Sequence, residues 1–269
     1  MKTLSRIYNG LIFTFLYAPI VVLIVYSFND SRNRVKWGGF TLDWYKELFQ
    51  NELIIESLVL TLQIAVLASV IATVIGTMAA LGMYSMNGRL RNVFMGVNNI
   101  PMVNPEIVTG ISMMLMFVAI GSVIPALKPG FLALLLAHVT FCIPYVVLQV
   151  MPKLRQMNKH QYEAALDLGC RPVPAFFKVV LPEIMPGVIT GALMAFTMSL
   201  DDFVISYFNG GSTAQNLSVT IYSMTKKPIT PEINALSTLM FGTVLLLLIV
   251  VNIRQVHDLN KQKERSKAR

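Results

Sequence analysis

Six long apolar stretches alternate with polar segments along the chain. A helix of about 20 residues crosses the roughly 30 Å of hydrocarbon in a bilayer, and each stretch reaches this length. The stretches span residues 8–28, 57–83, 93–124, 130–151, 187–208 and 233–253. The pattern predicts an all-α membrane protein with six transmembrane helices. The first stretch is longer than the apolar core of a signal peptide and has no clear cleavage site, so we expect an uncleaved helix.

The third stretch is interrupted where Pro101 and Pro105 lie four residues apart, with Glu106 directly after them. Each proline removes a backbone hydrogen-bond donor. We therefore expect this helix to be kinked or locally unwound at the interruption.

Two segments between apolar stretches are long enough to have structure of their own. In the segment 29–56, Thr41 is a candidate cap for a short helix. Its apolar face is expected to consist of Leu42, Tyr45, Leu48 and Phe49. The segment 209–232 contains glycines and prolines and is expected to form loops and turns.

The composition excludes an ordinary soluble enzyme. Only 13% of the residues are charged, against roughly 25% in soluble domains. The net charge is +8, but the chain has no polar domain that would present a basic face to nucleic acid. Cys142 and Cys170 lack metal-ligand spacing and are expected to be unpaired structural residues.

Lysine and arginine are more frequent in the N-terminus, 84–92, 152–186 and the tail than in the segments between them. Cytoplasmic loops of membrane proteins retain positive charge. This distribution predicts a multi-pass protein of a bacterial inner membrane with both termini in the cytoplasm. The basic tail, residues 255–269, is expected to lie beside anionic lipid.

The inner segment 152–186 has the pattern of two short helices joined by a tight turn. Glu, Ala and Leu favour a helix before Gly169, which stands where a left-handed cap would end it. Pro172 or Pro174 suits the first turn of a second helix. We expect Pro182 or Pro186 to end that second helix.

The spacing of residues in this segment resembles the EAA signature of ABC-importer permeases, EAA-x3-G-x9-I-x-LP. The matching residues are Glu163, Ala164, Ala165, Gly169, Val179, Leu181 and Pro182. Val179 in place of isoleucine is the one departure. The segments 37–45, 101–106, 138–145, 198–203 and 221–235 extend the resemblance to the C-type permease subunits of spermidine/putrescine importers.

The resemblance implies a type I (MetI-like) permease fold, with residues 1–254 as one transmembrane domain and 152–186 as its coupling loop. It also implies the partners: a second six-span permease in a heterodimer, two ATPase subunits and an extracytoplasmic polyamine-binding protein. No glycine in the chain is followed by lysine, so the phosphate-binding GxxxxGK[ST] loop is missing. ATP and Mg²⁺ are therefore expected in the partner ATPase, with no cofactor in this chain and no catalysis by it.

In this family the coupling loop docks in a cleft of the ATPase. The residues that the resemblance assigns to coupling are Glu163, Ala164, Ala165, Asp167, Gly169, Leu181 and Pro182. The two alanines permit close approach, and Glu163 and Asp167 are able to pair with basic groups.

Acidic residues within apolar stretches are energetically costly and mark a pathway or an internal pair. Asp201, Asp202 and Glu106 are the acidic candidates, and Tyr145 and Tyr207 are aromatic faces suited to ammonium groups. The alternative is structural: one aspartate caps a kinked helix and the other bonds to a neighbouring span. Tyr222 and Lys226, four residues apart, are candidates for an outer gate.

Two further features are expected to serve packing. His138 lies on an apolar stretch, where a hydrogen-bonded packing residue is expected. Gly187 and Gly191 form a Gly-x-x-x-Gly pattern that lets two helices approach closely.

Two other functions remain open from the residues alone. One is a type I ABC permease for another small solute, and the other is a proton-coupled secondary transporter. The second option is disfavoured because the halves 1–125 and 126–269 show no inverted repeat. A membrane enzyme would need a nucleophile or metal motif, and neither HExxH nor GxSxG is present.

Overall fold

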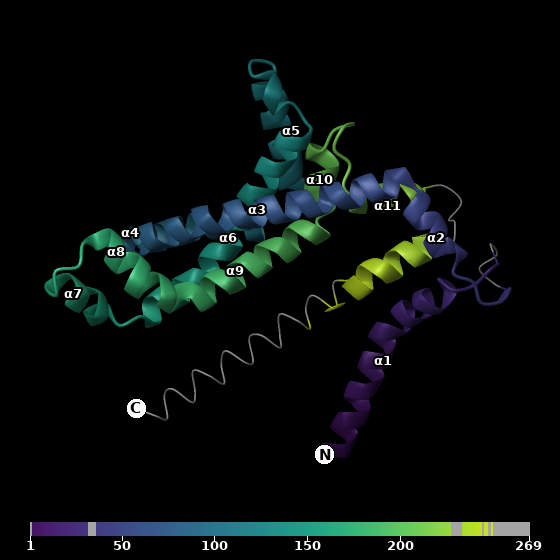
Figure 1. Ribbon diagram of the computed structural model, residues 1–269, viewed down its shortest axis with the longest axis horizontal. Helices are drawn as coiled ribbons and strands as arrows, with labels where there is room; N and C mark the ends of the chain where they lie inside the picture. The colour runs from purple at the N-terminus through teal and green to yellow at the C-terminus, as the bar shows by residue number, and fades with distance from the viewer. Residues whose placement is uncertain (1, 32–35, 227–232, 244, 247–248, 250–269) are drawn as a thin grey trace. The chain divides into compact units, whose positions relative to one another are not determined.

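The computed structural model describes all residues except 1, 32–35, 227–232, 244, 247–248 and 250–269 (Figure 1). The chain forms two compact units, which are described separately. One unit combines residues 1–54 with 223–269, and the other is Ile55–Tyr222. The predicted basic tail, residues 255–269, lies outside the described residues.

The described residues are almost entirely helical, as the apolar stretches predicted. In this described part of the chain, four helices are long and apolar enough to cross a membrane, or up to five if a bent pair of helices counts as one span. They include α1 (Lys2–Tyr26), α3 (Glu52–Ser85) and α6 (Phe131–Gln156). The predicted sixth span at 233–253 is described only in part, and its residues 233–243 are helical. The all-α class is confirmed.

In the first unit, α2 (Asp43–Gln50) packs back against the segment that follows α1. The prediction of Thr41 as the cap of α2 is wrong, because Leu42 is the N-cap residue and makes no side-chain cap bond. The Thr41 hydroxyl oxygen, one residue earlier, accepts a hydrogen bond from the Asp43 amide at 3.1 Å. The Trp44 indole donates to the Asn29 carbonyl at 2.8 Å. The Lys46 ammonium and the Thr41 hydroxyl hydrogen-bond to the Asp43 carboxylate and lower its pKa.

The predicted apolar face of α2 is wrong in part. Trp44 and Leu48 are its buried residues, whereas Leu42 and Phe49 are exposed. The hydrogen bond to Asn29 draws Trp44 inward, and this contact rotates the helix away from the face that spacing alone favoured.

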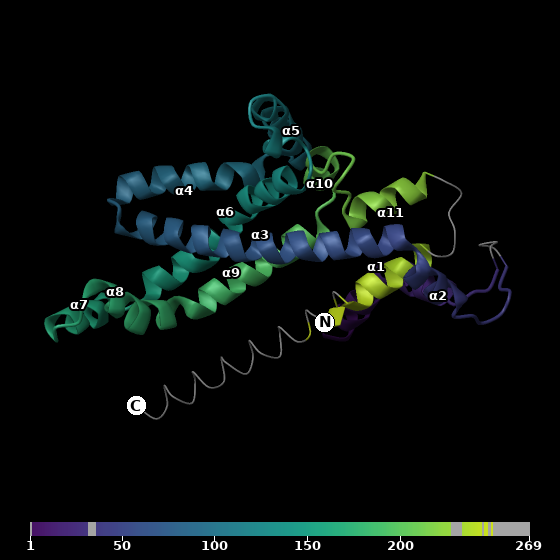
Figure 2. The same ribbon diagram turned by 45° about the horizontal axis from the view of Figure 1, so that its top comes forward.

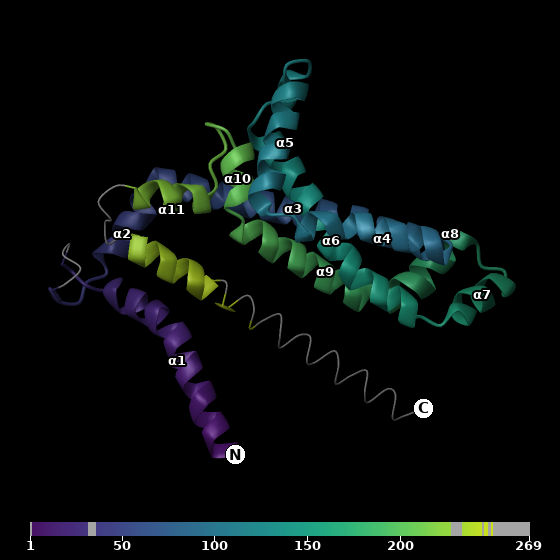
Figure 3. The same cartoon turned by 180° about the vertical axis from the view of Figure 1, so that it is seen from behind.

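In the second unit, α6 is the central helix. It packs along α9 (Leu181–Asp201), and most of its residues between Ala133 and Leu154 are buried. Figure 3 shows α7 (Lys159–Asp167) and α8 (Pro172–Ala175) at one end of α9, with α10 (Val204–Asn209) at the other. One continuous helix therefore connects the two ends of this unit.

The third predicted span is two helices rather than one kinked helix. α4 (Gly88–Val103) continues through Pro101, and α5 (Glu106–Gly121) leaves it at an angle of 100° (Figure 2). Asn104 between them is extended, with φ −73° and ψ 138°. A residue before proline is pushed out of the helical region. Pro105 therefore ends α4, and the extended Asn104 agrees with the expected local unwinding at the interruption.

Two further expectations about helix ends are wrong. The fifth span ends at Asp201 instead of Phe208, and α10 is a separate helix. The segment 209–232, expected as loops, contains α11 (Leu217–Thr225). The Asn216 side chain accepts from the Val219 amide at 3.0 Å and so caps the start of α11. This local cap explains a helix where glycines and prolines suggested none.

Candidate functional site

The inner turn between α7 and α8 has the geometry that the EAA spacing predicted. Gly169 adopts φ +82°, a conformation that residues with a Cβ rarely adopt. The Cys170 amide donates to the Ala165 carbonyl at 3.1 Å, and the Gly169 amide donates to the Leu166 carbonyl at 2.9 Å. These two bonds form a Schellman cap. The direction in which α8 leaves α7 is therefore fixed by Gly169.

The second helix of the loop does not end at Pro182 or Pro186, contrary to expectation. From Pro172 the helix continues to Asp201 as one membrane-length helix. A π-helical turn at Phe176–Val180 makes this possible, with the Leu181 amide bonding to the Phe176 carbonyl. The wider turn shifts the hydrogen-bond register just before Pro182, so the proline occupies the first turn of α9.

The predicted coupling residues occupy the exposed side of this loop. Glu163, Ala164, Asp167, Gly169 and Pro182 are exposed, whereas Ala165 and Leu181 are partly buried. The Glu163 carboxylate lies 3.2 Å from Nδ1 of His160. No observation on this chain tests their role in coupling, which stays a prediction.

Apolar side chains attach the coupling loop to the core. Tyr162 from α7, Phe176 from the π-helical turn and Leu181 pack against the buried cluster. Sequence reasoning missed the exposed apolar residues beside them: Leu168 is 88% exposed and Val173 65%.

Gly187 and Gly191 bring α9 and α6 into close contact, as the Gly-x-x-x-Gly pattern predicted. A Cβ at Gly187 would lie 2.8 Å from the Gln149 carbonyl oxygen, and one at Gly191 would lie 3.2 Å from the Cα of Val146. Gly76 on α3 faces the same valine, since its Cβ would lie 2.8 Å from that of Val146. Val146 therefore packs between α3 and α9, and each of these helices has a glycine at the point of contact.

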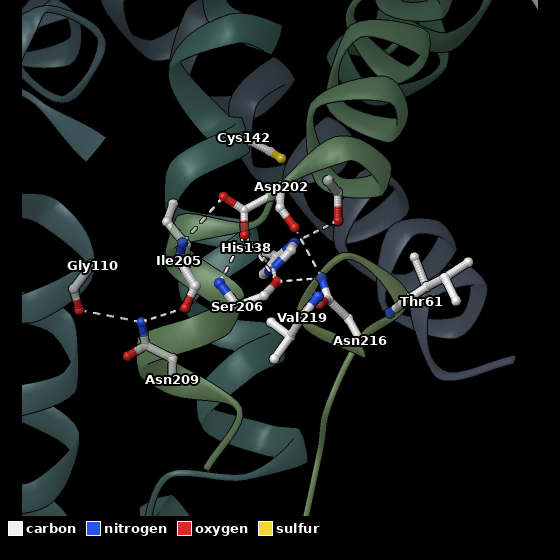
Figure 4. Close-up of polar contacts among 12 residues, drawn as sticks. Thr61, Gly110, His138, Cys142, Asp202, Ile205, Ser206, Asn209, Asn216 and Val219 are labelled. Carbon is white, nitrogen blue, oxygen red and sulfur yellow. Dashed lines mark hydrogen bonds and ion pairs between the residues drawn. The ribbon is translucent and has the colours of Figure 1, made fainter. Parts of the chain in front are cut away.

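The break between α9 and α10 is organised by Asp202. Its carboxylate accepts hydrogen bonds from the Ile205 amide at 3.2 Å and from the Ser206 amide at 2.8 Å (Figure 4). The Ser206 hydroxyl donates to the same carboxylate at 2.9 Å. Asp202 is buried, whereas Asp201, the last residue of α9, is exposed. Asp202 therefore caps α10. This agrees with the structural alternative, in which one of the two aspartates caps a helix.

His138 from α6 completes this network. Its Nδ1 lies 2.7 Å from the Ser199 hydroxyl, and its Nε2 lies 2.9 Å from the Ser206 hydroxyl and 3.5 Å from the Asp202 carboxylate (Figure 4). Asn216 donates to the Asp202 carbonyl at 2.9 Å and to the Ser206 hydroxyl at 2.7 Å. The prediction of His138 as a hydrogen-bonded packing residue is confirmed. Sequence reasoning missed the network partners Ser199, Ser206 and Asn216.

Two predicted aromatic candidates meet beside this network. The Tyr207 and Tyr222 rings are perpendicular, with centroids 6.2 Å apart. Phe203 contacts both rings, at 5.6 Å and 4.8 Å. Tyr207 is 47% exposed and Tyr222 42%, so the cluster offers partly open aromatic faces.

The remaining candidates are placed as follows. Glu106 is exposed at the first residue of α5, and Tyr145 on α6 is partly buried. Lys226 is exposed and directly follows α11, in the other compact unit from Tyr222. Nothing in the structure tests the proposed pathway or gate. Within the described part of the chain, no group of three or more His, Cys, Asp or Glu could hold a metal ion.

The arrangement of helices occurs in a solved transporter. The chain superposes with a TM-score of 0.68 on a crystal structure of a bacterial ABC transporter involved in the import of the acidic polysaccharide alginate. The match covers 93% of this chain and 92% of the other, at 16% identity. At this identity the likeness shows the fold of an ABC transporter permease and nothing about cargo.

The sequence comparisons show the family. The family model described as the binding-protein-dependent transport system inner membrane component matches residues 72–259. The chain belongs to this family of ABC-importer permeases, as the EAA signature indicated. The family implies a partner permease, an ATPase and a binding protein in the working importer.

Individual relatives cover most of the chain. It is 43% identical over 236 residues to the putrescine transport system permease protein PotI of Escherichia coli K12, across 86% of this chain and 83% of the relative. It is 38% identical over 247 residues to the spermidine/putrescine transport system permease protein PotC of Haemophilus influenzae, across 92% and 94%. The resemblance to polyamine-importer permeases is therefore confirmed.

Proposed function

We propose that this chain is one permease subunit of an ATP-driven importer of polyamines, with putrescine and spermidine as cargo. The observation that carries this proposal is the identity of 43% and 38% to permeases of putrescine and spermidine/putrescine systems over most of the chain. The exposed Asp201 and the half-exposed Tyr207 and Tyr222 rings support it. Carboxylates and aromatic faces replace water around ammonium groups.

The complete importer combines this chain with a second six-span permease in a heterodimer. It also contains two ATPase subunits, which bind ATP and Mg²⁺, and an extracytoplasmic polyamine-binding protein. This chain itself catalyses no reaction. It lies in a bacterial inner membrane with both termini in the cytoplasm, and the coupling loop is on the cytoplasmic side.

Transport proceeds by alternating access. The binding protein delivers the polyamine to the outer face, and closure of the ATPase subunits on ATP opens the permease pair outward. Hydrolysis then returns the pair to the inward state. The α7 turn docks on the ATPase through Glu163, Ala164, Ala165, Asp167, Gly169, Leu181 and Pro182. Because α9 runs without interruption from Leu181 to Asp201, movement of the loop is transmitted to the α9–α10 break.

On the path between the two permeases, Asp201, Glu106, Tyr145 and Tyr207 contact the cargo as it passes. Tyr222 and Lys226 contribute to the outer gate. Asp202 acts indirectly, because its carboxylate is already engaged in capping α10. Selection of the cargo rests largely with the binding protein.

Uptake of labelled putrescine and spermidine at low micromolar concentration tests this proposal. Cells lacking the chain and any redundant importer are compared with the same cells carrying the wild-type chain. Restored uptake of either amine supports the proposal. Unchanged uptake in the two strains leaves the family membership intact and overturns the polyamine cargo.

A further inference from the structure

The side chain of Asn216 joins the α9–α10 break to α11. It is buried, directly before the first residue of α11. Its amide nitrogen donates to the Asp202 carbonyl at 2.9 Å and to the Ser206 hydroxyl at 2.7 Å (Figure 4). Its amide oxygen accepts from the Val219 amide at 3.0 Å. One end of this side chain therefore holds the break, and the other end caps α11.

The orientation of the Asn216 amide follows from these partners. Both protons of its nitrogen are used, because the two acceptors lie on the side of the break. A reversed amide would turn its oxygen toward the Asp202 carbonyl and its nitrogen toward the Val219 N–H. Such pairs of like groups leave buried polar atoms without a partner, which is costly. The break and α11 are therefore connected by one amide with a single favourable orientation.

A second set of buried contacts attaches the other side of α11 to α3. The Leu217 amide donates to the Thr61 hydroxyl at 2.8 Å. The Ser57 and Thr220 hydroxyls lie 2.7 Å apart. All four of these residues are buried. Directional hydrogen bonds to α3 and to the α9–α10 break therefore fix the position of α11 from two sides.

The helices joined by Asn216 carry the aromatic cluster. Phe203 lies at the break, Tyr207 on α10 and Tyr222 on α11. The Phe203 and Tyr222 ring centroids are 4.8 Å apart. Since α9 begins at Leu181, within the coupling loop, and ends at the break, a movement of α9 reaches these rings through the residues that Asn216 holds.

We propose that Asn216 is a positioning residue that couples movement of the α9–α10 break to α11, and through α11 to the Tyr222 ring. When the coupling loop moves α9, the hydrogen bonds to Asp202 and Ser206 move the start of α11 with the break. Without these bonds, α11 stays with α3. The inference rests on the proposed function, which assigns Tyr222 to the outer gate, and it adds the connection by which ATP-driven movement reaches that gate.

The first test uses Asn216→Ser. Serine is also a favoured helix cap, so this variant keeps an acceptor for α11 and removes both donor contacts to the break. Ser57→Ala is the matched control, because it removes a buried hydroxyl contact of α11 on the side of α3 and leaves Asn216 in place. Both variants are measured in the assembled transporter in proteoliposomes with loaded binding protein. The readout is the number of amines imported per ATP hydrolysed.

Asn216→Ser is expected to lower this ratio about fivefold or more, because each lost hydrogen bond shifts an equilibrium by about that factor. ATP hydrolysis continues, since the coupling loop is unchanged. Ser57→Ala is expected to keep the wild-type ratio. A purely structural role of Asn216 would reduce uptake and hydrolysis together. An unchanged ratio in the Asn216→Ser variant, or an equal fall in both variants, overturns the coupling role.

A second test does not depend on amine transport. In a chain carrying Cys142→Ala and Cys170→Ser, with partner subunits free of accessible cysteines, Tyr222→Cys reports the position of α11 through its rate of reaction with a water-soluble thiol reagent. The rate is compared without nucleotide and with ATP under conditions that prevent hydrolysis. It is expected to differ between the two states, and Asn216→Ser is expected to remove the difference. Equal rates with Asn216 present, or a difference that persists in Asn216→Ser, overturn the coupling role.

The two proposals fail in different ways. A wild-type transporter that imports no amine overturns the proposed function. Amine import by the wild type, together with an unchanged ratio of import to hydrolysis in the Asn216→Ser variant, overturns the coupling role alone.

Discussion

His138 on α6 and Ser206 on α10 share a hydrogen bond of 2.9 Å whose direction is set by its neighbours. The Ser206 hydroxyl has one proton, and it donates that proton to Asp202. Asn216 also donates to the Ser206 oxygen. His138 must therefore donate from Nε2, which leaves Nδ1 of the neutral ring to accept from the Ser199 hydroxyl. This assignment follows from the network, and it ties α6, α9 and α10 together at the break.

The network separates the roles of two adjacent aspartates. Asp202→Ala removes three acceptor contacts at the start of α10 and is expected to destabilise the permease by about 1–3 kcal/mol. Asp201→Ala removes an exposed carboxylate and is expected to leave stability unchanged while slowing amine uptake. Thermal unfolding of the detergent-solubilised complex, measured beside uptake, distinguishes the two.

One result of this comparison would contradict the assignment of the cap to Asp202. If Asp201→Ala and Asp202→Ala lower the unfolding temperature equally, the assignment of the cap to Asp202 alone is wrong. Asp202→Asn serves as the conservative control, because its remaining carbonyl oxygen keeps part of the cap.

Hydropathy and proline placement predicted much of this fold because they act over short distances in the sequence. The spans around α1, α3 and α6 follow from the length of their apolar runs. The turn at Gly169 follows from a local motif whose hydrogen bonds lie within six residues. Where one segment alone determines the structure, the pattern was sufficient.

The failures arise where a distant contact decides. Trp44 is buried because its indole reaches the Asn29 carbonyl, 15 residues away. Asp202 is buried in a network that His138 and Asn216 complete through Ser206, and both partners come from other parts of the sequence. No pattern in the sequence separates Asp201 from Asp202, although one is exposed and the other is buried.

Close packing of α6 and α9 depends on Gly187. Gly187→Val is expected to prevent normal assembly, because a Cβ there would lie 2.8 Å from a backbone carbonyl of α6. Overpacking of this kind costs about 1–3 kcal/mol or more. Gly82→Val is the matched control, since a Cβ at Gly82 has nothing within 4 Å. Yield and monodispersity of the purified complex provide the measurement, and equal behaviour of the two variants would argue against close α6–α9 packing.

The turn at Gly169 requires a left-handed backbone and not an empty space. A Cβ at this position would meet nothing within 4 Å, but φ is +82°. Gly169→Val is therefore expected to distort the turn and abolish uptake, whereas Gly169→Asn, a residue that tolerates this region, retains part of it. Uptake and membrane insertion are measured together. Equal loss in both variants, with normal insertion, would point to a steric requirement of the partner instead.

Leu168 is the most exposed large apolar residue of the chain's coupling loop, at 88%. If the loop docks on the ATPase as proposed, a leucine this exposed is expected to be covered in the complex, because burying a leucine side chain contributes about 1.5–3 kcal/mol. Leu168→Ser is therefore expected to weaken retention of the ATPase subunits about tenfold or more during purification. Leu42→Ser, at a residue 50% exposed beside α2 and outside the coupling loop, is the control. Full retention of the ATPase by the Leu168→Ser variant would show that Leu168 lies outside the docked surface, and the polar residues Glu163 and Asp167 would then carry the contact.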